Sequence, residues 1–334
     1  MEPAPRTARH IDQGEMLLIR YAIAACGLLA APVALATPHD TSDVNWTGSL
    51  ASLNGATPAA GRLVVQPYVF YSETRNAFDN HSDRYAVTPS RSWRSIAVVT
   101  YGITDRFAAT ITPSVSRASS AGQSTDGIRS GDTSIRFQYM LQAPNADGTR
   151  AAFSLIAGHR FAVGRYDRLG SNGFNGGGSG VEGNNFAALY QQWFWLGSGR
   201  PLRVRANLGW APRPGHVSLR GASVYGTGRG FVGSANPGSN VNALVAAEYS
   251  ISRRWGLAMD LGWSHDSDTR VRGVDGQGFA VSSSSGPSAR WYASPAVEYH
   301  LSSSVGFIAG AEFAFAGRNS GATVTPQASV VMVF

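Results

Sequence analysis

The links between strands constrain the fold of this chain most strongly. Segments of about ten residues follow one another from residue 62 to the end of the chain, and short and long links alternate between them. The twelve segments are 62–72, 91–101, 106–116, 131–141, 150–161, 185–196, 202–210, 241–251, 255–264, 290–301, 305–315 and 326–334. Short turns such as 252–254 and 302–304 follow the even-numbered segments, and long polar links follow the odd-numbered ones, among them 73–90, 163–184, 211–240 and 265–289. Antiparallel strands that run up and down a closed barrel produce this alternation.

Apolar and polar side chains alternate within the segments. One parity of the ninth segment carries Trp255, Leu257, Met259, Leu261 and Trp263, whereas the other carries Gly256, Ala258, Asp260 and Gly262. A strand places two such sets on opposite faces. The last segment alternates as well and ends on an aromatic residue, Phe334, which is typical of the closing strand of a bacterial outer-membrane barrel. A soluble sandwich would also alternate, so the links decide the fold.

The composition agrees with a barrel in a membrane. Only 15% of the residues are charged, against roughly 25% in ordinary soluble domains. Beyond the N-terminal leader no stretch reaches the ~18 apolar residues of a spanning helix. If the mature protein is integral to a membrane, it must cross with strands, and only closed barrels then satisfy the backbone. The sequence therefore predicts an all-β fold, an antiparallel transmembrane up-and-down β-barrel of about 12 strands with short periplasmic turns and long extracellular loops.

The first 36 residues have the pattern of a secretory signal peptide. Arg20 precedes an apolar run, and an Ala-x-Ala site ends at Ala36, which predicts a mature start near Thr37. Met16 is an alternative true start. Retention as a membrane anchor and lipidation at Cys26 are the alternatives, but the apolar run is short and Pro32 interrupts it. Export by this signal predicts the outer membrane of a Gram-negative bacterium as the location.

Residues 37–61 are polar and rich in Ser, Ala, Asn and Gly. They are interpreted as a periplasmic N-terminal extension or as a small plug of the barrel lumen, with a disordered lead-in as the plainer reading. The domain organisation is then a signal peptide over 1–36, this extension over 37–61 and the outer-membrane barrel over 62–334.

Several short motifs resemble one family of barrels. They are Gln66-Pro67-Tyr68, Tyr101-Gly102-Ile103-Thr104-Asp105-Arg106, Ser130-Gly131-Asp132, Glu298-Tyr299 with Ser302-Ser303, and Gly317-Arg318-Asn319. With these motifs the region 62–334 resembles the meta-pathway of phenol degradation (MetA) family of bacterial outer-membrane β-barrels. The resemblance implies passage of hydrophobic or aromatic small molecules and carries no catalytic residues. The links 163–184 and 211–240 are longer than the family's usual compact loops.

Charged residues on the parity opposite to the apolar residues are predicted to line the lumen. The candidates are Arg136, Arg160, Arg203, Arg205, Arg290, Glu248, Asp260, Glu298 and Glu312. The bases fall mainly on the fourth, fifth and seventh segments and the acids on the eighth to eleventh, which suggests opposite arcs of the barrel. Two interpretations stay open: a transverse field across a narrow pore, or charges that pair and fill the lumen. His300 is either a lumen contact or an interfacial residue at the rim.

Enzyme and metal chemistry find little support in the pattern. A barrel hydrolase needs a nucleophile beside a base, and His159, with Ser154 on the other parity, is the only candidate considered. Asp266, Asp268 and Asp275 share one link, but solvated loop carboxylates explain them as well as a cation does. The glycine-rich stretch 170–183 lacks the Lys-Ser/Thr of a phosphate loop. We therefore expect no enzyme activity, no metal and no cofactor.

These observations predict an outer-membrane channel that passes small, hydrophobic or aromatic molecules by diffusion. The alternatives are a non-conducting structural or adhesive surface barrel and, third, an outer-membrane barrel hydrolase. The expected partners are outer-membrane lipid, a small-molecule solute, and the barrel-assembly machinery through the C-terminal strand that ends at Phe334. All 28 basic residues are Arg, and none of them forms a clustered basic helix, so no nucleic-acid partner is expected. The barrel is expected to be a monomer.

Overall fold

The computed structural model describes residues 39–334. The predicted signal peptide over 1–36 lies outside the described residues. Within 39–334, no helix is both long enough and apolar enough to cross a membrane. The helical structure described there is one short 3₁₀ turn, η1, at Gly173–Asn175. Strands make up the rest of the regular structure in this part of the chain.

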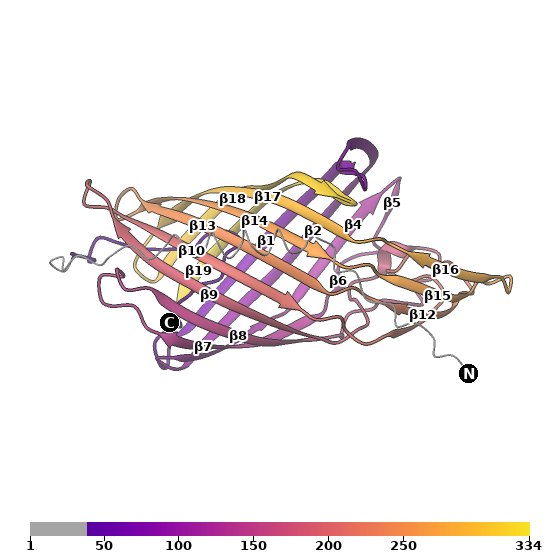
Figure 1. Cartoon of the computed structure of the whole chain (residues 1–334), viewed down its shortest axis with the longest axis horizontal. Helices are drawn as coiled ribbons and strands as arrows, with labels where there is room; N and C mark the ends of the chain where they lie inside the picture. Colours follow the sequence, from indigo (N-terminus) through magenta and orange to yellow (C-terminus); the bar gives the residue numbers. More distant parts are fainter. Residues whose placement is uncertain (1–38) are drawn as a thin grey trace, which may run out of the picture. The chain divides into compact units, whose positions relative to one another are not determined.

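Twelve antiparallel positions close into a barrel, which confirms the predicted fold class (Figure 1). The strands are β1 Leu63–Phe78, β2 Arg84–Thr104, β3 Phe107–Thr112, β4 Ser114–Ser120, β7 Thr133–Gln142, β8 Ala152–Phe161, β9 Gly183–Trp195, β10 Pro201–Ala211, β13 Asn240–Ser250, β14 Trp255–Asp266, β17 Ser288–His300, β18 Val305–Arg318 and β19 Ser320–Val333. Apart from β3 and β4, which share one position, each of these strands pairs with the strands before and after it. β1 pairs with both β2 and β19, which closes the barrel.

The third position of the barrel is divided between β3 and β4 at Pro113. Proline has no N–H to donate to a neighbouring strand, so a ladder is interrupted where it stands. β2 pairs with both pieces, whereas β7 pairs with β3 alone. β4 continues outward and meets the two-residue strands β5 Gln123–Ser124 and β6 Arg129–Ser130.

The strands alternate between an apolar outer face and a polar inner face. In β14 the outward Leu257 and Leu261 are each 48% exposed, whereas the inward Asp260 is fully buried. Large aromatics such as Tyr101, Trp210 and Trp255 are also exposed on the outer face. A soluble protein rarely exposes this much apolar surface to water, so the pattern fits strands that face lipid.

Four strands in the long links form a second sheet beyond the barrel wall. They are β11 Val217–Arg220, β12 Val232–Asn236, β15 Arg270–Val274 and β16 Ala280–Ser284, which pair in that order. Their buried face packs into a small core of Val181, Val217, Leu219, Phe231, Ala235 and Val271. Two long links therefore fold together into one structured body (Figure 1).

Two of the predicted long links are wrong. Strands β1 and β2 run through most of 73–90 and leave only the turn 79–83, where the Asp79 carboxylate accepts hydrogen bonds from the backbone N–H groups of His81 and Asp83. These bonds hold the pKa of Asp79 below its usual range. After β18 the link is the single residue Asn319, whose φ of 46° lies in the left-handed region that asparagine tolerates. We refer below to the short-turn end and the long-loop end of the barrel.

Candidate functional site

The inner wall carries a buried ion cluster near the short-turn end. Arg203 of β10 and Glu248 of the adjacent β13 are direct cross-strand partners and form an ion pair, with the Arg203 Nε donating to Oε1 at 3.2 Å. The Arg205 Nε lies 3.0 Å from the same carboxylate. All three side chains are at most 5% exposed. A buried carboxylate between two guanidinium groups has its charge compensated without water.

The expected separation of these charges onto opposite arcs is wrong. The seventh and eighth predicted segments are neighbours in the barrel, because β10 pairs directly with β13. Arg203 and Arg205 therefore pair with Glu248 instead of facing it across the lumen. For these three residues the structure has the geometry of charges that pair and fill the interior.

Two other predicted lumen acids bind the backbone of the N-terminal segment 40–61. The Asp260 carboxylate accepts from the N–H groups of Leu50 and Ala51 at 3.1 and 3.3 Å. The Glu298 carboxylate accepts from the N–H of Thr47 at 2.8 Å and lies 3.5 Å from His300 Nε2. His300 is only 4% exposed, so it is an inward contact and not an interfacial side chain.

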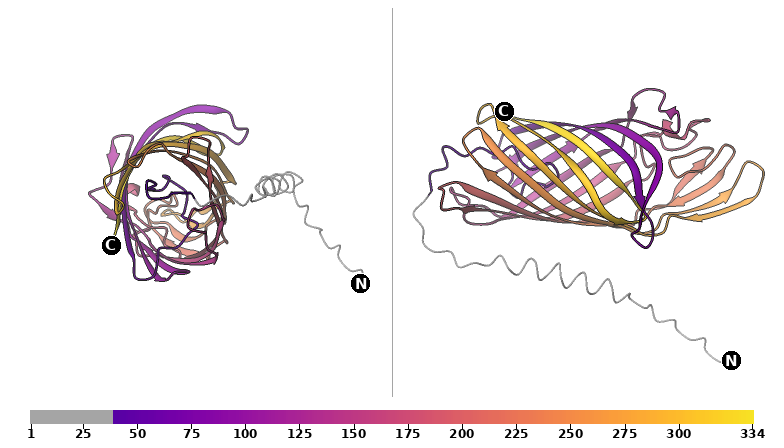
Figure 2. Two further views of the ribbon diagram at one scale, coloured as in Figure 1. Left: turned by 90° about the vertical axis from the view of Figure 1, so that its left-hand side faces the viewer. Right: turned by 90° about the horizontal axis from the view of Figure 1, so that it is seen from above.

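The segment 40–61 continues across the barrel interior from these anchors. Leu53 and Gly55 donate their backbone N–H groups to Asn207 and Gln191 at 2.7 and 3.3 Å. Farther round, the Gly61 N–H donates to the Gly102 carbonyl at 2.8 Å. The end-on view shows the indigo chain inside the ring of strands (Figure 2). The bonded partners lie on β17, β14, β10, β9 and β2, so the segment spans the barrel at its short-turn end.

Two side chains of the segment complete this packing. The Trp46 ring lies under the Arg203 guanidinium, 4.4 Å from its carbon, and meets Trp193 edge-on at 5.4 Å. Leu50 joins a buried cluster with Ala258, Ala296 and Ile308, which all come from inward positions of the wall. A cation over an indole face and a buried leucine both favour the inserted position of the segment.

The remaining predicted lumen residues lie toward the long-loop end. Arg290 of β17 pairs with Glu312 of β18 at 3.3 Å, and its guanidinium lies 5.1 Å from the centre of the Tyr292 ring. Arg160 of β8 lies 3.9 Å from Asp132 and has 45% of its side chain exposed. Arg136 of β7 is half-buried, and within the described residues it has neither an ion pair nor a side-chain hydrogen bond.

A cavity of about 600 Å³ lies at the long-loop end of the barrel. Its wall is rich in hydroxyl and amide groups, with one guanidinium from Arg160, one carboxylate from Asp266, and apolar contacts from Val181, Pro212 and Pro214. Tyr225 closes one side by donating its hydroxyl to the Ser179 carbonyl at 2.6 Å. Burial raises the pKa of Tyr225 to about 12, so this hydroxyl keeps its proton at neutral pH.

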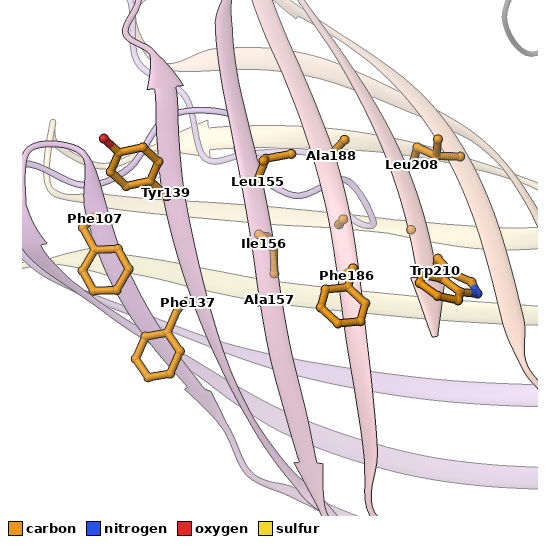
Figure 3. Close-up of a pocket in the computed structure, with 12 residues that line it drawn as sticks. Phe107, Phe137, Tyr139, Leu155, Ile156, Ala157, Phe186, Ala188, Leu208 and Trp210 are labelled. Carbon is orange, nitrogen blue, oxygen red and sulfur yellow. The ribbon is translucent and has the colours of Figure 1, made fainter. Parts of the chain in front are cut away.

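A second hollow, of about 570 Å³, is a crease in the outer face of the barrel (Figure 3). It is lined by outward residues that include Phe137, Leu155, Phe186 and Trp210, and almost no polar surface faces it. Hydrophobic groups of this kind on adjacent strands are the surface that acyl chains cover in a membrane barrel. We therefore assign the crease to the lipid-facing band and not to the lumen.

The residues considered for catalysis and cations have other contacts. His159 faces outward, with Nδ1 2.8 Å from Asn184 Oδ1 and Nε2 3.6 Å from Glu182. The Asp268 carboxylate lies 2.6 Å from Arg270 Nε and 3.2 Å from Arg213 Nη2. The hydrogen bond from Arg270 has the largest effect on the pKa of Asp268, which these contacts lower below its usual range. No group of three metal-ligating side chains gathers anywhere in residues 39–334.

Several inward residues were missed by the sequence analysis. Arg94 of β2 reaches the lumen with its guanidinium 4.7 Å from the centre of the Phe70 ring. Asn207 and Gln191 bind the segment 40–61, but neither was considered because neither is charged. The alternation along each strand predicts that all three side chains face inward. The partner of each residue, in contrast, depends on which strands are neighbours in the barrel.

Comparison with solved structures agrees with the fold. An outer membrane channel from Pseudomonas putida F1 superposes with a TM-score of 0.64 at 15% identity, covering 86% of this chain and all of the channel. The translocator domain of the autotransporter NalP from Neisseria meningitidis and a mutant of the TodX monoaromatic hydrocarbon channel each give a TM-score of 0.42 at 12% identity. The match with the NalP domain covers 96% of this chain and 95% of that domain. The match with the TodX mutant covers 83% of this chain and 91% of TodX. No family model and no curated protein matches the sequence.

Proposed function

We propose that this protein is an outer-membrane channel for small molecules whose lumen is closed at the periplasmic end by residues 40–61. The observation that carries the proposal is the division of the barrel wall. Its outer face is apolar, whereas its inner face carries charged and amide side chains. A cavity of about 600 Å³ with a largely polar wall lies at the long-loop end. A polar interior of this kind is what a lumen that admits water and solutes requires.

The orientation follows from the links. Short turns lie in the periplasm and long loops outside in barrels of this kind. The segment 40–61 then enters from the periplasmic side, where a cleaved signal peptide would leave it. The solutes are small and include aromatic molecules, as the resemblance to the phenol-degradation barrels implies.

Conductance in planar lipid bilayers tests the channel. We expect the mature protein to show small or infrequent openings, because the segment 40–61 is bonded to the wall at several strands. Replacing residues 45–57 with a Gly-Ser linker of equal length removes Trp46 and Leu50 and should raise the conductance severalfold. The altered gel mobility of unheated samples in detergent shows that each variant is folded.

A barrel whose linker variant is folded but does not conduct would not be a channel. The second candidate function, a structural or adhesive surface barrel, would then be favoured, since the structured body of β11, β12, β15 and β16 offers a surface at the long-loop end. Turnover of phospholipid or lipopolysaccharide that disappears in His159→Ala would support the third candidate, a hydrolase.

A further inference from the structure

Cationic side chains gather in the lumen between the segment 40–61 and the mouth cavity. Among the described residues, four arginines and three carboxylates face inward along this stretch of the wall. The arginines are Arg94, Arg136, Arg160 and Arg290, and the acids are Asp132, Asp266 and Glu312. Glu312 pairs with Arg290 and Asp132 with Arg160, while Asp266 accepts a hydrogen bond from Asn240 at the rim. Arg94 and Arg136 are left without a carboxylate within ion-pair distance.

Arg136 lies on the inward face of β7. Its cross-strand neighbours are Thr110 on β3 and Gly158 on β8. A Cβ atom on Gly158 would lie 3.1 Å from the Arg136 Cβ and 2.0 Å from the Asn185 side-chain oxygen, so only glycine fits beside the Arg136 stem. An arginine that is half-buried, unpaired and beside a glycine presents its donors to whatever enters the lumen.

Arg160 is the neighbour of Arg136 on the inner wall. In the register of β7 and β8, Arg160 lies opposite Ser134, and Arg136 lies opposite Gly158. The two arginines are thus diagonal neighbours, whose side chains are within reach of one another at about 7–8 Å. An anion that enters between the two side chains is attracted by both guanidinium groups.

Within residues 39–334, Asp132 is the acid that contacts this pair of arginines, and it already has other partners. The Asp132 carboxylate accepts hydrogen bonds from the backbone N–H groups of Gly164 and Ser179 at 3.1 and 2.8 Å and from the Ser179 hydroxyl at 2.6 Å. Its contact with the Arg160 Nε is longer, at 3.9 Å. Asp132 therefore ties the loop to the wall. Arg160 also donates from Nη2 to the Val181 carbonyl at 3.5 Å, and its remaining N–H donors are left for another acceptor.

We propose that Arg160 and Arg136 form a binding site for the carboxylate of a small organic anion that enters through the mouth cavity. Guanidinium groups bind carboxylates in a bidentate manner, and the Val181, Pro212 and Pro214 surface of the cavity accommodates an aliphatic or aromatic remainder. The inference rests on the proposed function, because it assigns a solute class to that channel: organic acids, such as aromatic carboxylates, in preference to neutral hydrocarbons.

Calorimetric titration of the folded, detergent-solubilised mature protein with benzoate tests the site. We expect saturable binding of benzoate and at least about tenfold weaker binding of benzamide, which has the same ring without the charge. Arg136→Gln and Arg160→Gln should each weaken benzoate binding about tenfold or more. The control is Arg254→Gln, which removes one exposed charge from the turn before β14. Its benzoate affinity should equal that of the unchanged protein.

The outcomes separate this inference from the channel itself. Equal binding of benzoate and benzamide, no binding of either, or full benzoate affinity in a folded Arg136→Gln,Arg160→Gln double variant would overturn the anion site, whatever the bilayers show. Benzoate binding with the expected losses in a protein that never conducts, even with the linker in place of 45–57, would keep the site and reject the channel.

Discussion

At the scale of single residues, Glu248 has the most demanding environment in the barrel. It is fully buried and balances two guanidinium groups that are themselves almost fully buried. Such a cluster adds little net stability compared with an apolar core of the same size, but removal of one member leaves uncompensated charge in a place that water does not reach. The cluster therefore behaves as an all-or-none unit.

Glu248→Ala should lower the free energy of unfolding by about 3–5 kcal/mol, because it leaves Arg203 and Arg205 buried side by side. The measurement is a urea titration in detergent that follows the heat-modifiable gel band. Glu182→Ala is the control, since Glu182 is exposed and lies 3.6 Å from His159, a contact worth at most about 1 kcal/mol. A Glu248→Ala protein as stable as this control would show that water reaches the cluster.

Gly102 is a second residue whose environment permits a sharp test. A Cβ atom there would lie 2.2 Å from the Ala59 carbonyl oxygen and 2.7 Å from that of Pro58, both in the segment 40–61. Gly102→Val should therefore displace this part of the segment and leave the barrel folded. Gly197→Val is the matched control, because a Cβ at Gly197 meets no atom within 4 Å.

The mature protein has no cysteine if the leader is removed, so Thr57→Cys introduces a unique thiol at a half-buried position of the segment for this test. We expect maleimide to label this thiol several times faster in the Gly102→Val background than in the Gly197→Val background, with barrel mobility on gels unchanged. Equal labelling rates would show that the segment does not rest against β2.

At the scale of elements, the strands of the barrel could be predicted from sequence because their signals are local. Residue alternation and turn spacing place all twelve, and most bounds agree within a few residues. The division at Pro113 has a local cause that the analysis did not use. The second sheet was missed, because β11, β12, β15 and β16 have only four or five residues, and β12 and β15 pair between different links.

The long link between β14 and β17 depends on Asp268. This carboxylate joins Arg270 on its own link to Arg213 on the link after β10. Because these partners lower its pKa, the carboxylate is fully charged at neutral pH, and its contribution is lost only when the pH falls through this lowered value. The contact therefore connects two loops under all physiological conditions.

Asp268→Asn should loosen the second sheet without affecting the barrel. We expect trypsin to cleave after Arg220 and Arg270 several times faster at neutral pH, with the barrel fragment still heat-modifiable. Asp83→Asn, in the turn between β1 and β2, is the control and should leave these two cleavage rates unchanged. Resistance equal to that of the unchanged protein would mean that the buried core of the sheet alone holds the loops together.

At the scale of the whole molecule, the lumen could be predicted only in part. The alternation along the strands assigned the nine charged candidates to the inner face. Which of them form ion pairs depends on the order of the strands, as for Arg203 and Glu248. The contacts of residues 40–61 were beyond prediction for the same reason, since the Thr47 N–H bonds to Glu298, which lies 251 positions along the chain. Local patterns determine faces, whereas long-range partners require the closed barrel.

The position of the membrane can be tested with two matched arginine substitutions. Leu261 of β14 and Val274 of β15 are both exposed, at 48% and 43%, but Leu261 lies on the outer wall among Val245 and Ala293, whereas Val274 belongs to the second sheet. Leu261→Arg should cost about 2–4 kcal/mol in lipid vesicles if it faces the middle of a bilayer. Val274→Arg should cost less than about 0.5 kcal/mol, because water covers it already. Unfolding of both variants by urea in vesicles gives the two values, and equal costs would contradict a barrel whose outer wall is solvated by lipid and whose second sheet is solvated by water.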